Sequence, residues 1–96
     1  MEKSSVELIN QGVLAAIDPA RLMYEYITGM TLAFPVDRKF SGEECGEIAS
    51  FTSRRLKWNL TRRRWPRVKV TVRNRKRGAQ NYVEVDIKDG FTPHDH

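Results

Sequence analysis

The N-terminal segment has apolar residues at the spacing of an α-helix. One apolar stripe is formed by Val6, Ile9, Val13 and Ile17. Ser4 and Glu7 precede the stripe as a capping box, in which the two side chains satisfy backbone N–H groups of the first turn. Asp18 and Pro19 have the residue types of a new helix start, with Asp as the N-cap and Pro at the first helical position. We therefore expect two helices here, the second over residues 19–28.

The next segment, residues 30–40, is apolar at first and is interrupted by Pro35. Proline donates no backbone hydrogen bond, so within sheets it is confined to edge strands, strand starts and bulges. The segment therefore predicts either a short edge strand over residues 31–34 or an extended crossing without strand pairing.

A longer helix is expected to begin after Ser41, which forms a second capping box with Glu44. The inner stripe of this helix consists of Cys45, Ile48, Ala49, Thr52, Leu56 and Leu60. Pro66 disfavours helical backbone at the residue before it, so we expect the helix to stop within residues 61–64.

After Pro66 the apolar residues recur at every second position, which is typical of half-buried strands. The two alternating runs contain Val68, Val70 and Val72, and then Val83, Val85 and Ile87. Gly78 lies in the turn between them, residues 74–80, where a hairpin loop often needs a positive φ. This pattern predicts an antiparallel β-hairpin. Because an isolated hairpin is marginal in water, its apolar face should pack on the preceding helix.

These elements predict a small α+β domain. It would consist of two N-terminal helices, a longer third helix and a C-terminal antiparallel hairpin packed on the helices, with a possible short third strand at residues 31–34. A chain of 96 residues has room for one core. We assign residues 1–90 to this single domain and expect residues 91–96 to be a flexible tail.

Charge is distributed unevenly along the chain. Residues 1–50 contain four basic and eight acidic side chains, whereas residues 51–96 contain thirteen basic and four acidic ones. Segregation of this kind suggests that the C-terminal half meets an anionic partner.

The run from Arg54 to Arg77 contains twelve Lys or Arg residues and no acidic residue, and nine of the twelve are arginine. Guanidinium groups are planar and permanently charged, which suits bidentate contacts with phosphate or carboxylate. Trp58 and Trp65 lie within the run, and for both we favour packing over base stacking. The candidate binding residues are Arg54, Arg55, Lys57, Arg62, Arg63, Arg64, Trp65, Arg67, Arg75, Lys76 and Arg77.

Cross-strand pairing is the competing explanation for the cations of the strands. Arg67, Lys69 and Arg73 lie across the predicted hairpin from Glu84 and Asp86. Charge pairs of this kind contribute about 0.2–1 kcal/mol each to an ordinary sheet. We therefore exclude Lys69 from the candidates and rank Arg67 and Arg73 below the others.

We expect a nucleic-acid-binding protein that uses the end of the long helix and the turn at residues 74–78 as one continuous basic surface. Contacts would be made mainly with the phosphate backbone, and the sequence does not distinguish DNA from RNA. The alternative is a small inhibitor or accessory protein, for example of a phage or mobile element. Its arginines would bind an acidic surface or the nucleic-acid channel of a larger protein.

Other kinds of chemistry find little support in the sequence. Cys45 is the only cysteine, and its place on an apolar stripe is typical of a small buried side chain. Glu43 and Glu47 are explained by the positive end of a helix dipole, and His94 and His96 lie in the expected tail. We therefore expect no enzymatic activity, metal, cofactor or small-molecule substrate. Without a long apolar run or a signal peptide, a soluble cytoplasmic protein with no membrane partner is expected.

Overall fold

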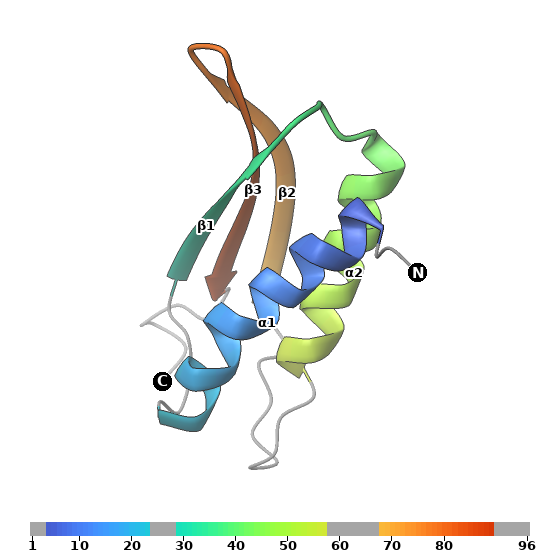
Figure 1. Cartoon of the computed structure of the whole chain (residues 1–96). Helices are drawn as coiled ribbons and strands as arrows, with labels where there is room; N and C mark the ends of the chain where they lie inside the picture. Colours follow the sequence, from blue (N-terminus) through green and yellow to red (C-terminus); the bar gives the residue numbers. More distant parts are fainter. Residues whose placement is uncertain (1–3, 24–28, 58–67, 90–96) are drawn as a thin grey trace.

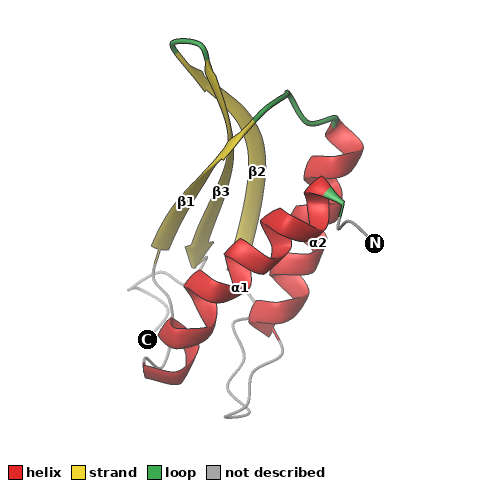
Figure 2. Ribbon diagram, viewed as in Figure 1, coloured by secondary structure: helices red, strands yellow, loops and turns green. Residues whose placement is uncertain are grey.

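The computed structural model describes residues 4–23, 29–57 and 68–89 of the chain (Figure 1). Its elements are, in order, α1 (Ser5–Met23), β1 (Gly29–Val36), α2 (Gly42–Lys57), β2 (Val68–Arg77) and β3 (Gln80–Asp89). The strands form one antiparallel sheet in the order β1-β3-β2. Both helices lie on one side of this sheet, so the described residues form two layers (Figure 2).

The predicted arrangement of three helices followed by a hairpin is wrong, because the described elements follow the order helix, strand, helix, strand, strand. The two predicted N-terminal helices are one helix, α1, which continues through Asp18 and Pro19 to Met23. Proline removes one backbone donor, but its fixed φ is itself close to the helical value. Because Pro19 lies near the C-terminal end of α1, the helix has little more than one turn left to form beyond it.

The segment expected to be a short edge strand or an unpaired crossing is a full strand of eight residues, β1. It pairs with β3 from Gly29 opposite Lys88 to Val36 opposite Asn81. Pro35 is therefore part of an edge strand, where a missing backbone donor is tolerated. The partner strand is about fifty residues away in sequence, so local signals alone do not reveal this pairing.

The hairpin forms from the two alternating runs, as predicted, but its turn is shorter than expected. Residues 74–77 and Gln80, which were expected in the turn, belong to β2 and β3. β2 and β3 pair from Val68 opposite Asp89 to Arg77 opposite Gln80, and a two-residue turn joins them. Gly78 has a φ of 63°, a backbone conformation that residues with a Cβ rarely adopt. Since β1 adds to the free edge of β3, β3 becomes the central strand.

The core lies between the sheet and the helices. Central strand β3 contributes three fully buried side chains, Val83, Val85 and Ile87. The helices meet them with buried residues at helical spacing, which are Ile9, Val13 and Ile17 from α1 and Cys45, Ile48 and Leu56 from α2. α2 packs against β2, so a helix does cover the apolar face of the hairpin as expected. The opposite face of the sheet carries the polar residues of the alternation.

Gly12 allows α1 to approach β1 closely. A Cβ atom placed on Gly12 would lie 2.6 Å from Cε1 of the Phe34 ring. Glycine destabilises a helix by about 1 kcal/mol relative to alanine, so a favourable packing contact has to offset its presence inside α1. The Phe34 ring supplies that contact, which sets the distance between the two layers.

The connection between β1 and α2 is held by two sets of side-chain hydrogen bonds. Ser41 and Glu44 form the predicted capping box, with the Ser41 N–H donating to Glu44 over 2.9 Å and the Glu44 N–H donating to Ser41 Oγ over 3.1 Å. Both terminal N–H groups of Arg38 donate hydrogen bonds to the Glu44 carboxylate, at 2.7 and 2.8 Å. These bonds from Arg38, assisted by the Ser41 N–H, lower the pKa of Glu44 to about 2.

The second set joins this connection to β2. The side-chain amide of Asn74 donates to the carbonyl of Phe40 over 2.8 Å, and its Oδ1 accepts the Phe40 N–H over 2.8 Å. Phe40 itself is buried. One side chain therefore satisfies both backbone groups of a buried residue, as a neighbouring strand would.

We expect Asn74→Ala to lower the free energy of unfolding by about 1–3 kcal/mol, because the N–H and carbonyl of Phe40 lose their partners in a partly buried place. Urea denaturation measures this change. Gln80→Ala is the matched control, since the Gln80 amide also donates to a backbone carbonyl, that of Val36, but in an exposed position. Water can replace that bond, so the control should change stability by no more than about 0.5 kcal/mol. Equal losses in the two variants would contradict the role assigned to Asn74.

Candidate functional site

The face of the sheet opposite the helices, here called the outer face, carries seven charged side chains among the described residues. Strand residues alternate between the two faces of a sheet, so every second side chain of each strand lies on the outer face, and the register determines which of them are neighbours. The outer face carries five cations, which are Lys69, Arg73, Arg75, Arg77 and Lys88. Its two carboxylates are Glu84 and Asp86. Within the described ranges no other element covers this face (Figure 2).

On the outer face, the arginines of β2 lie beside the carboxylates of the neighbouring strand β3. Glu84 contacts the Nε atoms of two arginines, that of Arg73 at 3.4 Å and that of Arg75 at 3.3 Å. Arg73 also places Nη2 at 3.7 Å from Asp86. The arginine side chains are 47% and 58% exposed, whereas that of Glu84 is only 18% exposed. Exposed ion pairs contribute little to stability, so their main effect here is to orient the guanidinium groups.

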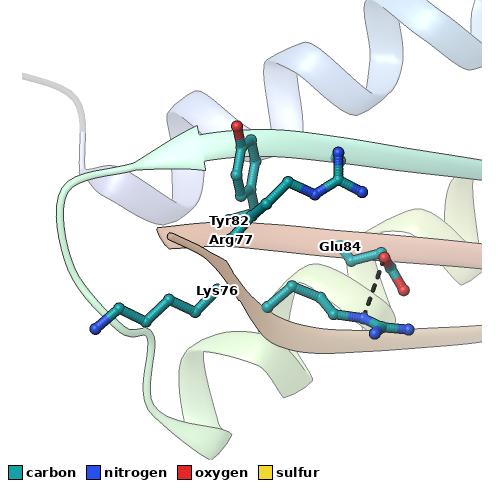
Figure 3. Close-up of a pocket in the computed structure, with 6 residues that line it drawn as sticks. Lys76, Arg77, Tyr82 and Glu84 are labelled. Carbon is teal, nitrogen blue, oxygen red and sulfur yellow. Dashed lines mark ion pairs between the residues drawn. The ribbon is translucent and has the colours of Figure 1, made fainter. Parts of the chain in front are cut away.

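The end of the hairpin adds cations on both sides of the sheet. Figure 3 shows Arg77 lying alongside the ring of Tyr82, whereas Lys76 points away from both. This divergence follows from the register, since adjacent residues of a strand point to opposite faces. In the part of the chain that the structure describes, neither Arg77 nor Lys76 has an ion-pair partner. Both charges are therefore available to an external anion.

A surface pocket of about 370 Å³ lies at this end of the outer face. It is lined by Ala33, Arg75, Lys76, Arg77, Tyr82 and Glu84, and so by residues of all three strands (Figure 3). The Tyr82 ring is half-buried. The pocket thus combines an aromatic ring, two guanidinium groups and one carboxylate.

The structure describes the two ends of the predicted basic surface but not the residues between them. Arg54 and Arg55 are exposed on the last turns of α2, where Arg55 lies 3.6 Å from Asp18 of α1. The C-terminal end of α2, formed by Lys57, lies at the opposite end of the molecule from the β2–β3 turn (Figure 1). β2 runs away from that end, and a strand of ten residues spans roughly 33 Å. Residues 58–67, which would link these two ends, lie outside the described ranges, so the continuous surface stays a prediction.

The remaining predicted residues lie outside the described ranges. They are Arg62, Arg63, Arg64, Trp65 and Arg67, and the expected tail at residues 91–96 also lies there. The pairing expected between Arg73 and the carboxylates of β3 is confirmed. Lys69 lies opposite another cation, Lys88, instead. Tyr82 was not among the site residues predicted from the sequence. Its position among the polar residues that alternate with Val83, Val85 and Ile87 could have indicated an aromatic side chain on the surface.

Other chemistry in the described residues is sparse. Cys45 is buried in the core, and this burial raises the pKa of its thiol. Glu43 and Glu47 are exposed near the start of α2. Among the described side chains, no group of three or more His, Cys, Asp or Glu residues is placed to hold a metal ion. None of the described helices combines the length and apolar character that crossing a membrane requires.

Comparisons with models of protein families, with curated proteins and with solved structures find no match to this chain. Function must therefore be argued from the geometry and charge of the site itself.

Proposed function

We propose that this protein binds nucleic acid, without catalysis, through the outer face of its sheet. The observation that carries the proposal is a row of guanidinium groups along β2, formed by Arg73, Arg75 and Arg77 and here called the arginine row. Alternate residues of a strand lie about 6.7 Å apart, so the row is an extended track of positive charge. An extended phosphate backbone is the ligand that such a track suits best.

Local charge compensation does not account for the whole row. The two carboxylates Glu84 and Asp86 face five cations on the outer face. Glu84 makes its shortest contact with Arg75 at Nε, and the Arg75 side chain is still 58% exposed, with its terminal nitrogens at the far end of the guanidinium group. Those nitrogens are the ones that can bind a phosphate in bidentate fashion. The carboxylates therefore orient Arg73 and Arg75, and among the described residues they leave Arg77 without an ion pair.

An acidic protein surface is the alternative partner, since guanidinium groups also bind carboxylates. The ring of Tyr82 favours nucleic acid, because a planar surface beside Arg77 offers a base a place to stack. Carboxylate side chains make no comparable use of an aromatic ring. The proposal therefore assigns the outer face to nucleic acid.

The test is a binding titration with a labelled oligonucleotide of about 20 nucleotides at several salt concentrations. We expect binding at low salt and a log–log slope of affinity against salt of about −3, as for four phosphate contacts on a single strand. Poly-glutamate of equal total charge is the control ligand. No binding of the oligonucleotide at about 50 mM salt would contradict the proposal, and tighter binding of poly-glutamate would support the alternative partner.

A further inference from the structure

We infer that the nucleic acid bound by this protein is single-stranded and that one unpaired base stacks on Tyr82 in the outer-face pocket. This inference rests on the proposed function and extends it, because phosphate contacts alone would not distinguish a single strand from a duplex. It is carried by three observations: the side of the sheet on which Tyr82 lies, the composition of the pocket, and the direction of the arginine row.

Tyr82 lies on the side of the sheet away from the core. Its neighbour Val83 is fully buried against the helices, so the alternation directs Tyr82 to the outer face. In the register, Tyr82 stands between Pro35 of β1 and Arg75 of β2. The aromatic residues that pack on the core side are Phe34, against α1, and the buried Phe40. Tyr82 is therefore not needed for the core, and its ring is presented on the central strand of an uncovered sheet.

The pocket around this ring has the size and chemistry that a base requires. Its volume of about 370 Å³ lies in the range of small-ligand pockets. Arg77 and Tyr82 line the same pocket, so a base stacked on the ring would have a planar cation nearby (Figure 3). Both Glu84 oxygens already contact arginines, which leaves little capacity for reading base edges. We therefore expect base stacking with weak sequence preference.

The arginine row runs from this pocket along β2. Arg75 and Arg77 both line the pocket and Arg73 continues the row beyond it, so a strand whose base occupies the pocket can place its neighbouring phosphates on these guanidinium groups. In a duplex the faces of the bases are covered by their neighbours, and extruding one base costs a few kcal/mol. Aromatic residues on a basic sheet face are a recurring way of binding unpaired bases. These points together favour a single strand over a duplex.

The test compares three ligands of equal length at one salt concentration: a single strand, its duplex, and a strand of abasic sites with the same phosphates. We expect the single strand to bind about 5- to 150-fold more tightly than the abasic strand, the ratio that stacking of one base contributes. The duplex should bind more weakly than the single strand. Equal affinity for all three ligands would overturn the inference.

Variants of Tyr82 separate stacking from folding. Tyr82→Phe keeps the ring and should keep the affinity for the single strand. Tyr82→Ala should lower that affinity about 5- to 150-fold and leave the affinity for the abasic strand unchanged. Tyr82→Leu keeps apolar bulk without an aromatic face, so it should resemble Tyr82→Ala in binding and remain folded.

The outcomes also separate this inference from the proposed function. If the wild-type protein binds none of the three ligands at low salt, both fail. If it binds all of them and Tyr82→Ala has no effect on any affinity, the outer face binds phosphates and the inference alone is wrong. If Tyr82→Leu binds the single strand as the wild type does, Tyr82 acts through packing and the inference is again overturned.

Discussion

The variant Arg75→Glu/Arg77→Glu is expected to bind single-stranded oligonucleotides about 100-fold more weakly than the wild type, or worse. Each substitution removes a charge-assisted hydrogen bond to phosphate and introduces a charge that repels the backbone. The glutamate at position 75 would also stand beside Glu84, whose carboxylate now contacts Arg75 at 3.3 Å. Fluorescence anisotropy at constant salt measures the loss.

The matched control is Arg54→Glu/Arg55→Glu on α2, which changes the net charge of the protein by the same amount. These residues lie on the last turns of α2, near the end of the molecule that is remote from the hairpin turn (Figure 1). At about 0.15 M salt, exposed charges further apart than roughly 8 Å are largely screened from each other. The control should therefore bind almost as well as the wild type.

Two results would contradict this assignment. Equal losses in the two double variants would mean that net charge alone governs binding. A loss confined to Arg54→Glu/Arg55→Glu would place the site at the end of α2 and exclude the hairpin. Both variants alter exposed side chains, and each places a glutamate beside an existing carboxylate, Glu84 or Asp18, so a similar small decrease in the midpoint of urea denaturation is expected in both.

Ile48→Ala is expected to lower the free energy of unfolding by about 2–5 kcal/mol. The Ile48 side chain is fully buried on the face of α2 that meets the core. Removing three carbon atoms there loses apolar contact and leaves a cavity that the surrounding strands and helix fill only in part. Because domains of this size are stable by about 5–15 kcal/mol, the loss is a large fraction of the total. Urea or thermal denaturation followed by circular dichroism measures it.

Thr52→Val is the matched control, one turn further along the same face of α2. Thr52 is also fully buried, and its hydroxyl has no hydrogen-bond partner among the described residues. Replacing an unpaired hydroxyl by a methyl group of similar shape should leave stability unchanged or raise it. A change of less than about 1 kcal/mol for Ile48→Ala would contradict the packing of α2 onto the sheet. A large loss for Thr52→Val would show that the hydroxyl is bonded.

Local sequence signals predicted the elements whose determinants lie close together in the chain. The alternation from Val68 to Val72 and the turn glycine Gly78 are enough to specify the hairpin, because strand pairing there is between neighbours. The start of α2 follows from the capping box of Ser41 and Glu44, whose hydrogen bonds span three residues.

The remaining elements depend on contacts between distant segments. Pro19 is a local stop signal, yet α1 passes through it. β1 is a strand because its backbone pairs with β3, which lies about fifty residues further along the chain. Met30 pairs with Ile87 and Leu32 with Val85. A local pattern cannot show which distant edge will supply those hydrogen bonds.

By itself, the sequence determined the α2 capping box, the hairpin, and the concentration of arginine in the C-terminal half. It also identified Arg75, Lys76 and Arg77 as candidate contacts. Only the tertiary structure decided that Tyr82 lies beside Arg77 on a face that the described helices leave open, and that the end of α2 lies far from them. The physical reason is that the spacing of apolar residues along the chain indicates which side chains of a helix or strand face the core. Which of the remaining side chains share a surface depends on the strand register.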